Sequence, residues 1–123
     1  MEDAQTQLIK DVFELDETEQ IFYEFSCSLS QTASLPGRLY VTEHFLCFSG
    51  NVFGIETKKK IEIEHIKKMY KDTQMMIFDS SIVVELAESA GYKENKMRFN
   101  SFDNRDDVLD CITSIWQAVS SYA

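Results

Sequence analysis

The sequence predicts a mainly β fold of the α+β class, in which about seven short antiparallel strands form a small barrel or sandwich. Two observations predict the strands: apolar and polar residues alternate in short segments between residues 21 and 102, and turn residues separate these segments. A third observation is that a helical apolar period precedes the strands and another follows them. The length of 123 residues fits one domain with one core.

The N-terminal segments predict a helix, a strand and a loop. Residues 5–15 carry apolar side chains near helical spacing, which predicts a short helix. Residues 21–29 alternate and predict a half-buried strand. Its inward side chains are expected to be Ile21, Tyr23, Phe25, Cys27 and Leu29. Residues 30–37, which end in Pro-Gly, predict a loop.

The middle of the chain predicts a series of hairpins. A strand at 38–42 places Leu39 and Val41 on one face, and a tight turn at Glu43 and His44 leads into its partner strand at 45–49. In the next strand, 56–64, one face is expected to hold Thr57, Lys59, Ile61 and Ile63, and the other Lys58, Lys60, Glu62 and Glu64. Further strands are predicted at 66–71, 81–86 and 96–102.

The C-terminal segment changes to a helical period. Its apolar residues form one stripe of Val108, Leu109, Ile112, Ile115, Trp116 and Val119. Asp103 or Asn104 can cap this helix, and two aspartates lie in its first turn, where the helix dipole favours anions. We expect the stripe to cover the open end of the barrel, because an amphipathic helix must bury its apolar face.

The cysteines and the termini indicate an intracellular protein. Cys27, Cys47 and Cys111 are widely spaced and fall in apolar-periodic segments, so we expect three reduced core thiols. The N-terminal segment is acidic and polar, which predicts no signal peptide. No apolar run approaches the roughly 18 residues that a membrane span requires.

The charge is unevenly distributed along the chain. The formal net charge is −9, which argues against a nucleic-acid partner. Residues 50–71, however, hold six lysines and three glutamates, a net charge of +3. The remainder holds 6 basic and 18 acidic residues, a net charge of −12. The basic segment adjoins an apolar turn, and the folded protein can therefore be electrically polarised.

No pattern predicts catalysis, a metal site or a cofactor. A serine hydrolase of the nucleophile-elbow type would need a G-x-S-x-G motif, and the chain has none. His44 and His65 are the only histidines, and neither has a nucleophile or metal partner in the sequence pattern. Arg105 with Asp106 is interpreted as a structural pair that fixes the last helix.

Three stretches of the sequence resemble the GRAM domain, a pleckstrin-homology-like family. They are YEFSCSL, GRLYVTEHFLCFSGNVFGIETKKKIEI and FNSFDNRDDVLDCITSIW, and the resemblance covers residues 8–119. It is closest to the GRAM modules of sterol-transfer proteins at membrane contact sites. The chain departs from the family pattern at Leu15-Asp16, where Leu-Pro is usual, and between Lys71 and Ile82, which lacks Pro-Asn-Ala.

The resemblance implies a pleckstrin-homology-like fold of seven strands with a C-terminal capping helix. It further implies a non-catalytic targeting module that binds anionic lipid headgroups, phosphatidylserine or a phosphoinositide, at the cytosolic face of membranes. Such modules usually belong to longer multidomain proteins, so we expect an excised domain. The alternative is a protein-interaction module without lipid binding, whose acidic surface docks a basic partner.

The expected lipid site combines cations with an apolar loop. The cations are Arg38, Lys58, Lys59, Lys60, Lys67, Lys68 and Lys71. The loop consists of Val52, Phe53, Gly54 and Ile55. Gly54 is expected to take a positive φ and form the turn that presents its apolar neighbours. The loop at 30–37 has no lysine and, before Arg38, no arginine, which argues against tight stereospecific phosphoinositide capture.

Overall fold

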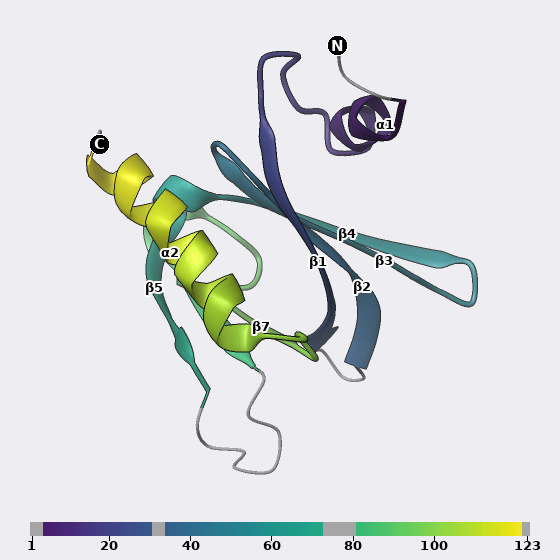
Figure 1. The fold of residues 1–123 in the computed structure, drawn as a ribbon. Helices are drawn as coiled ribbons and strands as arrows, with labels where there is room; N and C mark the ends of the chain where they lie inside the picture. The colour runs from purple at the N-terminus through teal and green to yellow at the C-terminus, as the bar shows by residue number, and fades with distance from the viewer. Residues whose placement is uncertain (1–3, 31–33, 73–80, 122–123) are drawn as a thin grey trace.

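A computed structural model of the chain shows a seven-stranded antiparallel sheet with one helix at each end of the chain (Figure 1). The structure describes residues 4–30, 34–72 and 81–121. The strand order is β4-β3-β2-β1-β7-β6-β5. The elements are α1 (Ala4–Val12), β1 (Ile21–Ser30), β2 (Ser34–Thr42), β3 (Phe45–Val52), β4 (Ile55–Glu62), β5 (Ile66–Lys71), β6 (Ile82–Leu86), β7 (Lys96–Asn100) and α2 (Arg105–Ser121). The predicted fold class is confirmed.

Helix α1 ends three residues earlier than predicted. Glu14 takes a positive φ of 53°, and Leu15 N–H donates to the Lys10 carbonyl at 2.8 Å. Glu14 N–H donates to the Asp11 carbonyl at 3.3 Å, which completes a Schellman-type end. The helix is therefore stopped by a residue in the left-handed conformation, directly before Leu15-Asp16, where the family usually has Leu-Pro.

Strand β1 departs from its predicted alternation at its first residues. A register shift between Ile21 and Tyr23 inserts an extra residue against β2. Ile21 therefore packs with Phe13 under α1, while Cys27 and Leu29 face the main core. The expectation that Ile21 and Tyr23 share the inward face is wrong, because the extra residue places Ile21 on the side of α1. Tyr23 stacks on Phe25 and is more exposed than expected.

Strand β2 begins inside the segment that was predicted to be a loop. Ser34, Leu35 and Pro36 already pair with β1. Pro36 is tolerated here because pairing of β2 with β3 ends at Gly37 opposite Gly50, so its missing N–H removes no bond on that side. Gly37 and Gly50 lie under the Phe48 ring, where a Cβ atom would fall 2.7 Å and 3.2 Å from ring atoms.

The core has two parts, one on each side of the sheet. The larger part lies inside the curved sheet and includes Leu39, Val41, Phe48, Ile61, Ile82, Val84 and Phe99. The smaller part lies under α1, where Phe13 packs on Tyr40 and Cys47. Helix α1 thus covers one end of the outer face of β2 and β3, and leaves the other end of that face open.

Helix α2 closes the barrel as predicted. The Asn104 side chain accepts from Asp107 N–H at 3.3 Å, which caps the helix, and Val108 and Ile112 are buried in the main core. The half-buried Trp116 donates from Nε1 to the Ile66 carbonyl at 3.2 Å. In the described part of the chain, neither helix has the length and apolar character needed to cross a membrane.

The strand predicted at 56–64 is wrong at its C-terminal end. Strand β4 stops at Glu62, and Ile63–His65 form a turn of 3-10 helix that leads into β5. The departure from the family pattern between Lys71 and Ile82 falls mainly on residues 73–80, which lie outside the described residues.

Candidate functional site

The β3–β4 hairpin ends in a two-residue turn. Val52 pairs with Ile55, and the two residues between them both have positive φ, 54° at Phe53 and 78° at Gly54. Two successive positive φ values are typical of a type I′ turn, whose twist matches that of the flanking strands. The predicted conformation of Gly54 is confirmed.

The turn presents apolar side chains to solvent. Phe53 is 99% exposed and Ile55 is 72% exposed, while Val52 is half-buried. The hairpin projects sideways from the rest of the sheet, on the side away from α2 (Figure 1). A large aromatic side chain at the tip of a projecting hairpin has no folding role, and such exposed apolar groups mark interaction sites.

The three consecutive lysines of β4 lie on two faces of the sheet and have different contacts. Lys58 and Lys60 lie on the outer face of the sheet, while Lys59 lies on the other face. Lys59 forms an ion pair with Glu94 at 3.3 Å. Lys60 lies 4.5 Å from the centroid of the Phe45 ring and donates to the Glu14 carbonyl at 3.3 Å. Lys58 is exposed, and the structure records no ion pair for it within the described residues.

A cross-strand row brings Arg38 and Lys58 to one face. Ser26 of β1 pairs with Arg38 of β2, Arg38 with Ser49 of β3, and Ser49 with Lys58 of β4. Side chains paired in this way lie on the same face of a sheet, so the two cations are two strands, or roughly 10 Å, apart. Lys58 is also three residues, or roughly 10 Å, from Ile55 at the turn.

A polar hollow of about 650 Å³ lies along this row. Its walls include Ser26, Ser28, Arg38, Ser49 and Asn51. The Arg38 guanidinium lies 3.6 Å from Glu24, an exposed pair of the kind that contributes little to stability. Arg38 can therefore exchange this partner for another anion in the hollow at small cost.

Lys67, Lys68 and Lys71 form a separate group on β5. Strands β4 and β5 lie at opposite ends of the strand order. Strand β5 begins at Ile66, after the C-terminal end of β4, whereas the β3–β4 turn precedes the N-terminal end of β4. Lys71 is ion-paired with Asp106 at 2.8 Å, and Lys68 lies 5.1 Å from the centroid of the Tyr70 ring. The structure does not bring this group together with Lys58 at the hairpin tip.

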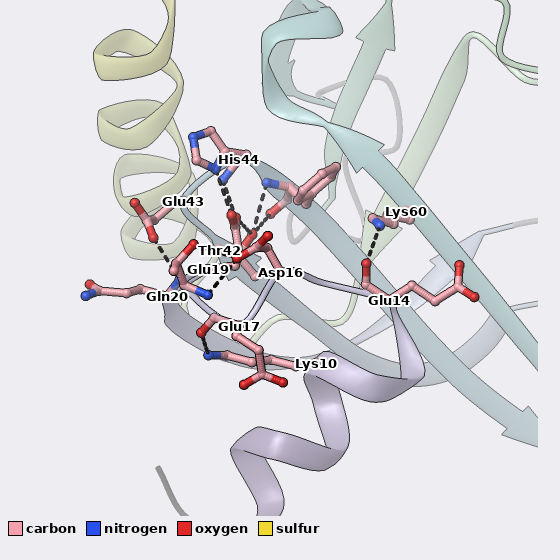
Figure 2. A network of polar contacts seen from close by, with 12 residues as sticks. Lys10, Glu14, Asp16, Glu17, Glu19, Gln20, Thr42, Glu43, His44 and Lys60 are labelled. Carbon is pink, nitrogen blue, oxygen red and sulfur yellow. Dashed lines mark hydrogen bonds and ion pairs between the residues drawn. The ribbon is translucent and has the colours of Figure 1, made fainter. Parts of the chain in front are cut away.

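The end of β3 remote from the tip is held by a buried carboxylate. Glu19, in the segment before β1, accepts from Thr42 Oγ1 at 2.7 Å and from His44 N–H at 2.8 Å, and it lies 2.7 Å from His44 Nδ1. Figure 2 shows these side chains converging on Glu19, with Lys10 directed at the Glu17 carbonyl below them. The network fixes the segment between α1 and β1 against the β2–β3 turn.

This network also sets the ionisation of its members. Burial acts to raise the pKa of Glu19, but the hydrogen bonds from His44 and Thr42 outweigh it and hold that pKa below its ordinary value. The hydrogen bond to Glu19 raises the pKa of His44. The carboxylate and the imidazolium therefore stabilise each other.

The remaining reactive groups have structural surroundings. Burial raises the pKa of Cys27 and of Cys47 to about 12, so both thiols are inert, while Cys111 is half-buried. Arg105 is buried and bonds Asp106 and the Ser81 carbonyl, which agrees with its predicted role of fixing α2.

One group of metal-ligating side chains is present in the described part of the chain. Single oxygen or nitrogen atoms of Glu62, Glu64 and His65 lie within 4.8 Å of one another. His65 Nδ1 already lies 2.9 Å from the Tyr92 hydroxyl and 3.1 Å from Glu62. These contacts use the imidazole to join the 3-10 turn to the β6–β7 connection.

The structure thus divides the predicted site. It gathers the turn 52–55, Arg38 and Lys58 at one end of the outer sheet face, and it directs Lys59 and Lys60 to partners within the fold. The serines of the polar hollow were not predicted as site residues. The alternation in YEFSCSL placed Ser26 and Ser28 outward, but it could not show that β3 brings Ser49 and Asn51 beside them.

Comparison with known proteins places the chain in a family. A family model described as "GRAM domain" matches residues 7–121. The membrane-anchored lipid-binding protein LAM5 of Saccharomyces cerevisiae is 32% identical over 98 residues, 80% of this chain and 14% of LAM5. Protein Aster-A of Homo sapiens is 31% identical over 103 residues, 84% of this chain and 13% of Aster-A. The chain therefore spans about one seventh of the length of these relatives.

Solved structures support the same fold. The C-terminal domain of an unknown protein from Leishmania infantum superposes with a TM-score of 0.75 at 22% identity, covering 92% of this chain and 98% of that domain. The Vps36 N-terminal PH domain superposes with a TM-score of 0.66 at 8% identity, covering 87% and 86%. Domains of these families are generally non-catalytic. The chain belongs to the GRAM domain family and has the pleckstrin-homology-like fold.

Proposed function

We propose that this domain is a non-catalytic membrane-targeting module that binds anionic lipid headgroups through the β3–β4 turn and the adjoining cations. The observation that carries the proposal is the pair of exposed apolar side chains, Phe53 and Ile55, on a projecting turn close to Lys58 and Arg38. The name of LAM5, a membrane-anchored lipid-binding protein, supports the same class of function.

The energies of the two kinds of contact are comparable. Burying an exposed aromatic or aliphatic side chain contributes about 2 kcal/mol. A lysine or arginine near an anionic leaflet contributes about 1 kcal/mol. The net charge of −9 repels the domain as a whole, so only a local basic face can orient it. Insertion and attraction together give weak, reversible binding.

The polar hollow offers a binding site for a phosphate group. When Phe53 reaches the boundary between headgroups and acyl chains, the row from Ser26 to Lys58, roughly 10 Å behind the tip, lies near the level of the lipid phosphates. Arg38 offers charge, and Ser49 and Asn51 offer neutral donors. Lys58, which pairs with Ser49 on the next strand, adds a second cation beside the hollow. The hollow is wide and carries few cations, which favours phosphatidylserine, or any anionic lipid, over one particular phosphoinositide.

The other predicted cations take smaller parts in the proposal. Lys60 holds β4 to the end of α1, and Lys59 is neutralised by Glu94. Lys67, Lys68 and Lys71 lie away from the tip and act only through the long-range field. We further propose that the membrane surface concerned is cytosolic, because anionic lipids concentrate in that leaflet.

A vesicle panel at fixed salt tests the proposal. The domain is mixed with vesicles of neutral lipid, of neutral lipid with phosphatidylserine, and of neutral lipid with one phosphoinositide at matched surface charge. We expect sedimentation with both anionic vesicles, little with neutral ones, and a fall in binding as salt rises. Equal binding to neutral vesicles would remove the electrostatic part, and no binding to any of them would overturn the proposal.

A further inference from the structure

A second surface lies at the end of β3 remote from the hairpin tip. A groove of about 570 Å³ runs between α2, the start of β1 and the β2–β3 turn. Strand β3 has eight residues, so roughly 25 Å of strand separates this groove from the turn at Phe53. A ligand in the groove would leave the membrane-binding tip free.

The lining of the groove is apolar and incompletely covered. Phe22 is 46% exposed, Ile115 and Val119 are half-buried, and Ala118 is exposed. The cause lies in α2: Val108 and Ile112 reach the main core, but the apolar stripe continues toward the helix end beyond them. The register shift in β1 turns Phe22 outward beside this part of the stripe. The groove is therefore built from ordered secondary structure on both sides.

The rim of the groove is acidic. Glu43 and Glu64 line it, and a smaller adjoining hollow of about 210 Å³ shares His44, Glu64 and Val119 and adds Glu62. His44 is the one basic group among these lining residues, and its charge is balanced by Glu19 at 2.7 Å. Glu43 accepts from Gln20 N–H at 2.8 Å. The described lining of both hollows includes neither lysine nor arginine.

We propose that this groove docks a cationic amphipathic helix of a protein partner. The apolar face of such a helix would cover Phe22, Ile115 and Val119, and its lysines or arginines would meet Glu43 and Glu64. Charge complementarity selects this occupant, because an acidic or anionic ligand would be repelled by the carboxylates on the rim, whose described lining holds no lysine or arginine. The proposal concerns a site distinct from the lipid-binding face and does not depend on lipid binding.

A pair of matched variants at Ala118 tests the site. The probe is an 18-residue helix of leucine and lysine with leucines on one face, and its comparator has the same composition scrambled so that no apolar face forms. Fluorescence anisotropy measures binding to the whole chain. We expect the amphipathic probe to bind at least tenfold more tightly than the scrambled one. Ala118→Arg should weaken binding at least tenfold, while Ala118→Glu, of similar size but opposite charge, should weaken it far less.

Charge removal supplies the second control. Glu43→Gln with Glu64→Gln should weaken probe binding about tenfold and reduce its salt dependence, whereas Glu56→Gln, which removes a charge outside the groove, should change it less than twofold. Backbone amide shifts should change around Phe22 and residues 114–119. Thermal unfolding shows that each variant is folded. Equal losses for Ala118→Arg and Ala118→Glu, equal effects of Glu56→Gln, or shifts located elsewhere would overturn the proposal.

Discussion

Glu19 Oε1 lies 2.7 Å from His44 Nδ1, so a buried carboxylate ahead of β1 holds the turn between β2 and β3. This pair couples stability to pH. The lowered pKa of Glu19 stabilises the fold above its ordinary pKa of 4.5, and the benefit is lost as pH falls through the folded value. The raised pKa of His44 stabilises the fold below 6.5, and this benefit is lost as pH rises through the folded value.

We therefore expect the contribution of the pair to be largest between about pH 4.5 and 6.5. Glu19→Gln should lower the free energy of unfolding by about 1–3 kcal/mol in this window, because charged hydrogen bonds are lost. Urea unfolding of both proteins from pH 4 to 8 measures the difference. A difference that stays constant over this range would contradict the coupling.

The aromatic side chain at the tip should act on dissociation from membranes. Phe53→Ser should raise the dissociation rate from phosphatidylserine-containing vesicles roughly thirtyfold, since about 2 kcal/mol of apolar burial is lost, with little change in association. Its melting temperature should stay near that of the wild type, because Phe53 is 99% exposed. Stopped-flow binding to vesicles separates the two rates. An unchanged dissociation rate would show that Phe53 does not enter the membrane.

Neighbouring lysines should behave differently. Lys58→Gln should slow association with anionic vesicles several-fold, because Lys58 is exposed on the face that carries Arg38. Lys59→Gln should change association little, because its ammonium lies 3.3 Å from Glu94 on the other face. Rates measured at two salt concentrations check both. Equal effects of the two changes would mean that only the total charge of β4 matters.

Two glycines should respond to alanine for different reasons. A Cβ atom at Gly37 would lie 2.3 Å from the Ser49 carbonyl oxygen, so Gly37→Ala must separate β2 from β3, at a cost of about 1–3 kcal/mol or more. At Gly54 a Cβ atom meets nothing within 4 Å, and only its φ of 78° resists the change, by about 1 kcal/mol. Chemical unfolding compares the two. A more stable Gly37→Ala variant would show that the strands can adjust.

Trp116 tests how far α2 contributes to the core. Because this side chain is half-buried, Trp116→Ala should cost roughly 2–3 kcal/mol, less than the 3–5 kcal/mol of a fully buried tryptophan. Trp116→Phe should cost about 1 kcal/mol, since it loses mainly the hydrogen bond to the Ile66 carbonyl. Calorimetry measures both. Equal costs would assign the whole effect to the hydrogen bond.

Sequence periodicity predicted the elements that bury one face. The alternation of Leu39 and Val41 and the stripe of Val108 and Ile112 were correct, because burial on one side is what those periods record. It failed where the backbone departs from its regular period. The bulge after Ile21 places that side chain on the other face of the sheet. Glu14, in the left-handed conformation, stops helix α1, although no glycine or proline in the sequence signals a helix end there.

The candidate site was predictable only in its local parts. The turn at Gly54 and the opposite directions of Lys58 and Lys59 follow from neighbouring residues. The pairing of Lys59 with Glu94 and the cross-strand row from Ser26 to Lys58 depend on how distant segments meet. The periodicity of a single segment does not show which distant segment it will contact.

The backbone at the hairpin tip also bears on how this position evolves. A φ of 54° suits asparagine or glycine far better than phenylalanine, and Asn-Gly is the favoured pair for this turn. The Phe53 ring is 99% exposed, so its packing within the fold does not offset the energetic cost of this backbone conformation. Mutational drift toward a more stable hairpin would replace it, so a phenylalanine that persists here is kept by selection for something outside the folded chain.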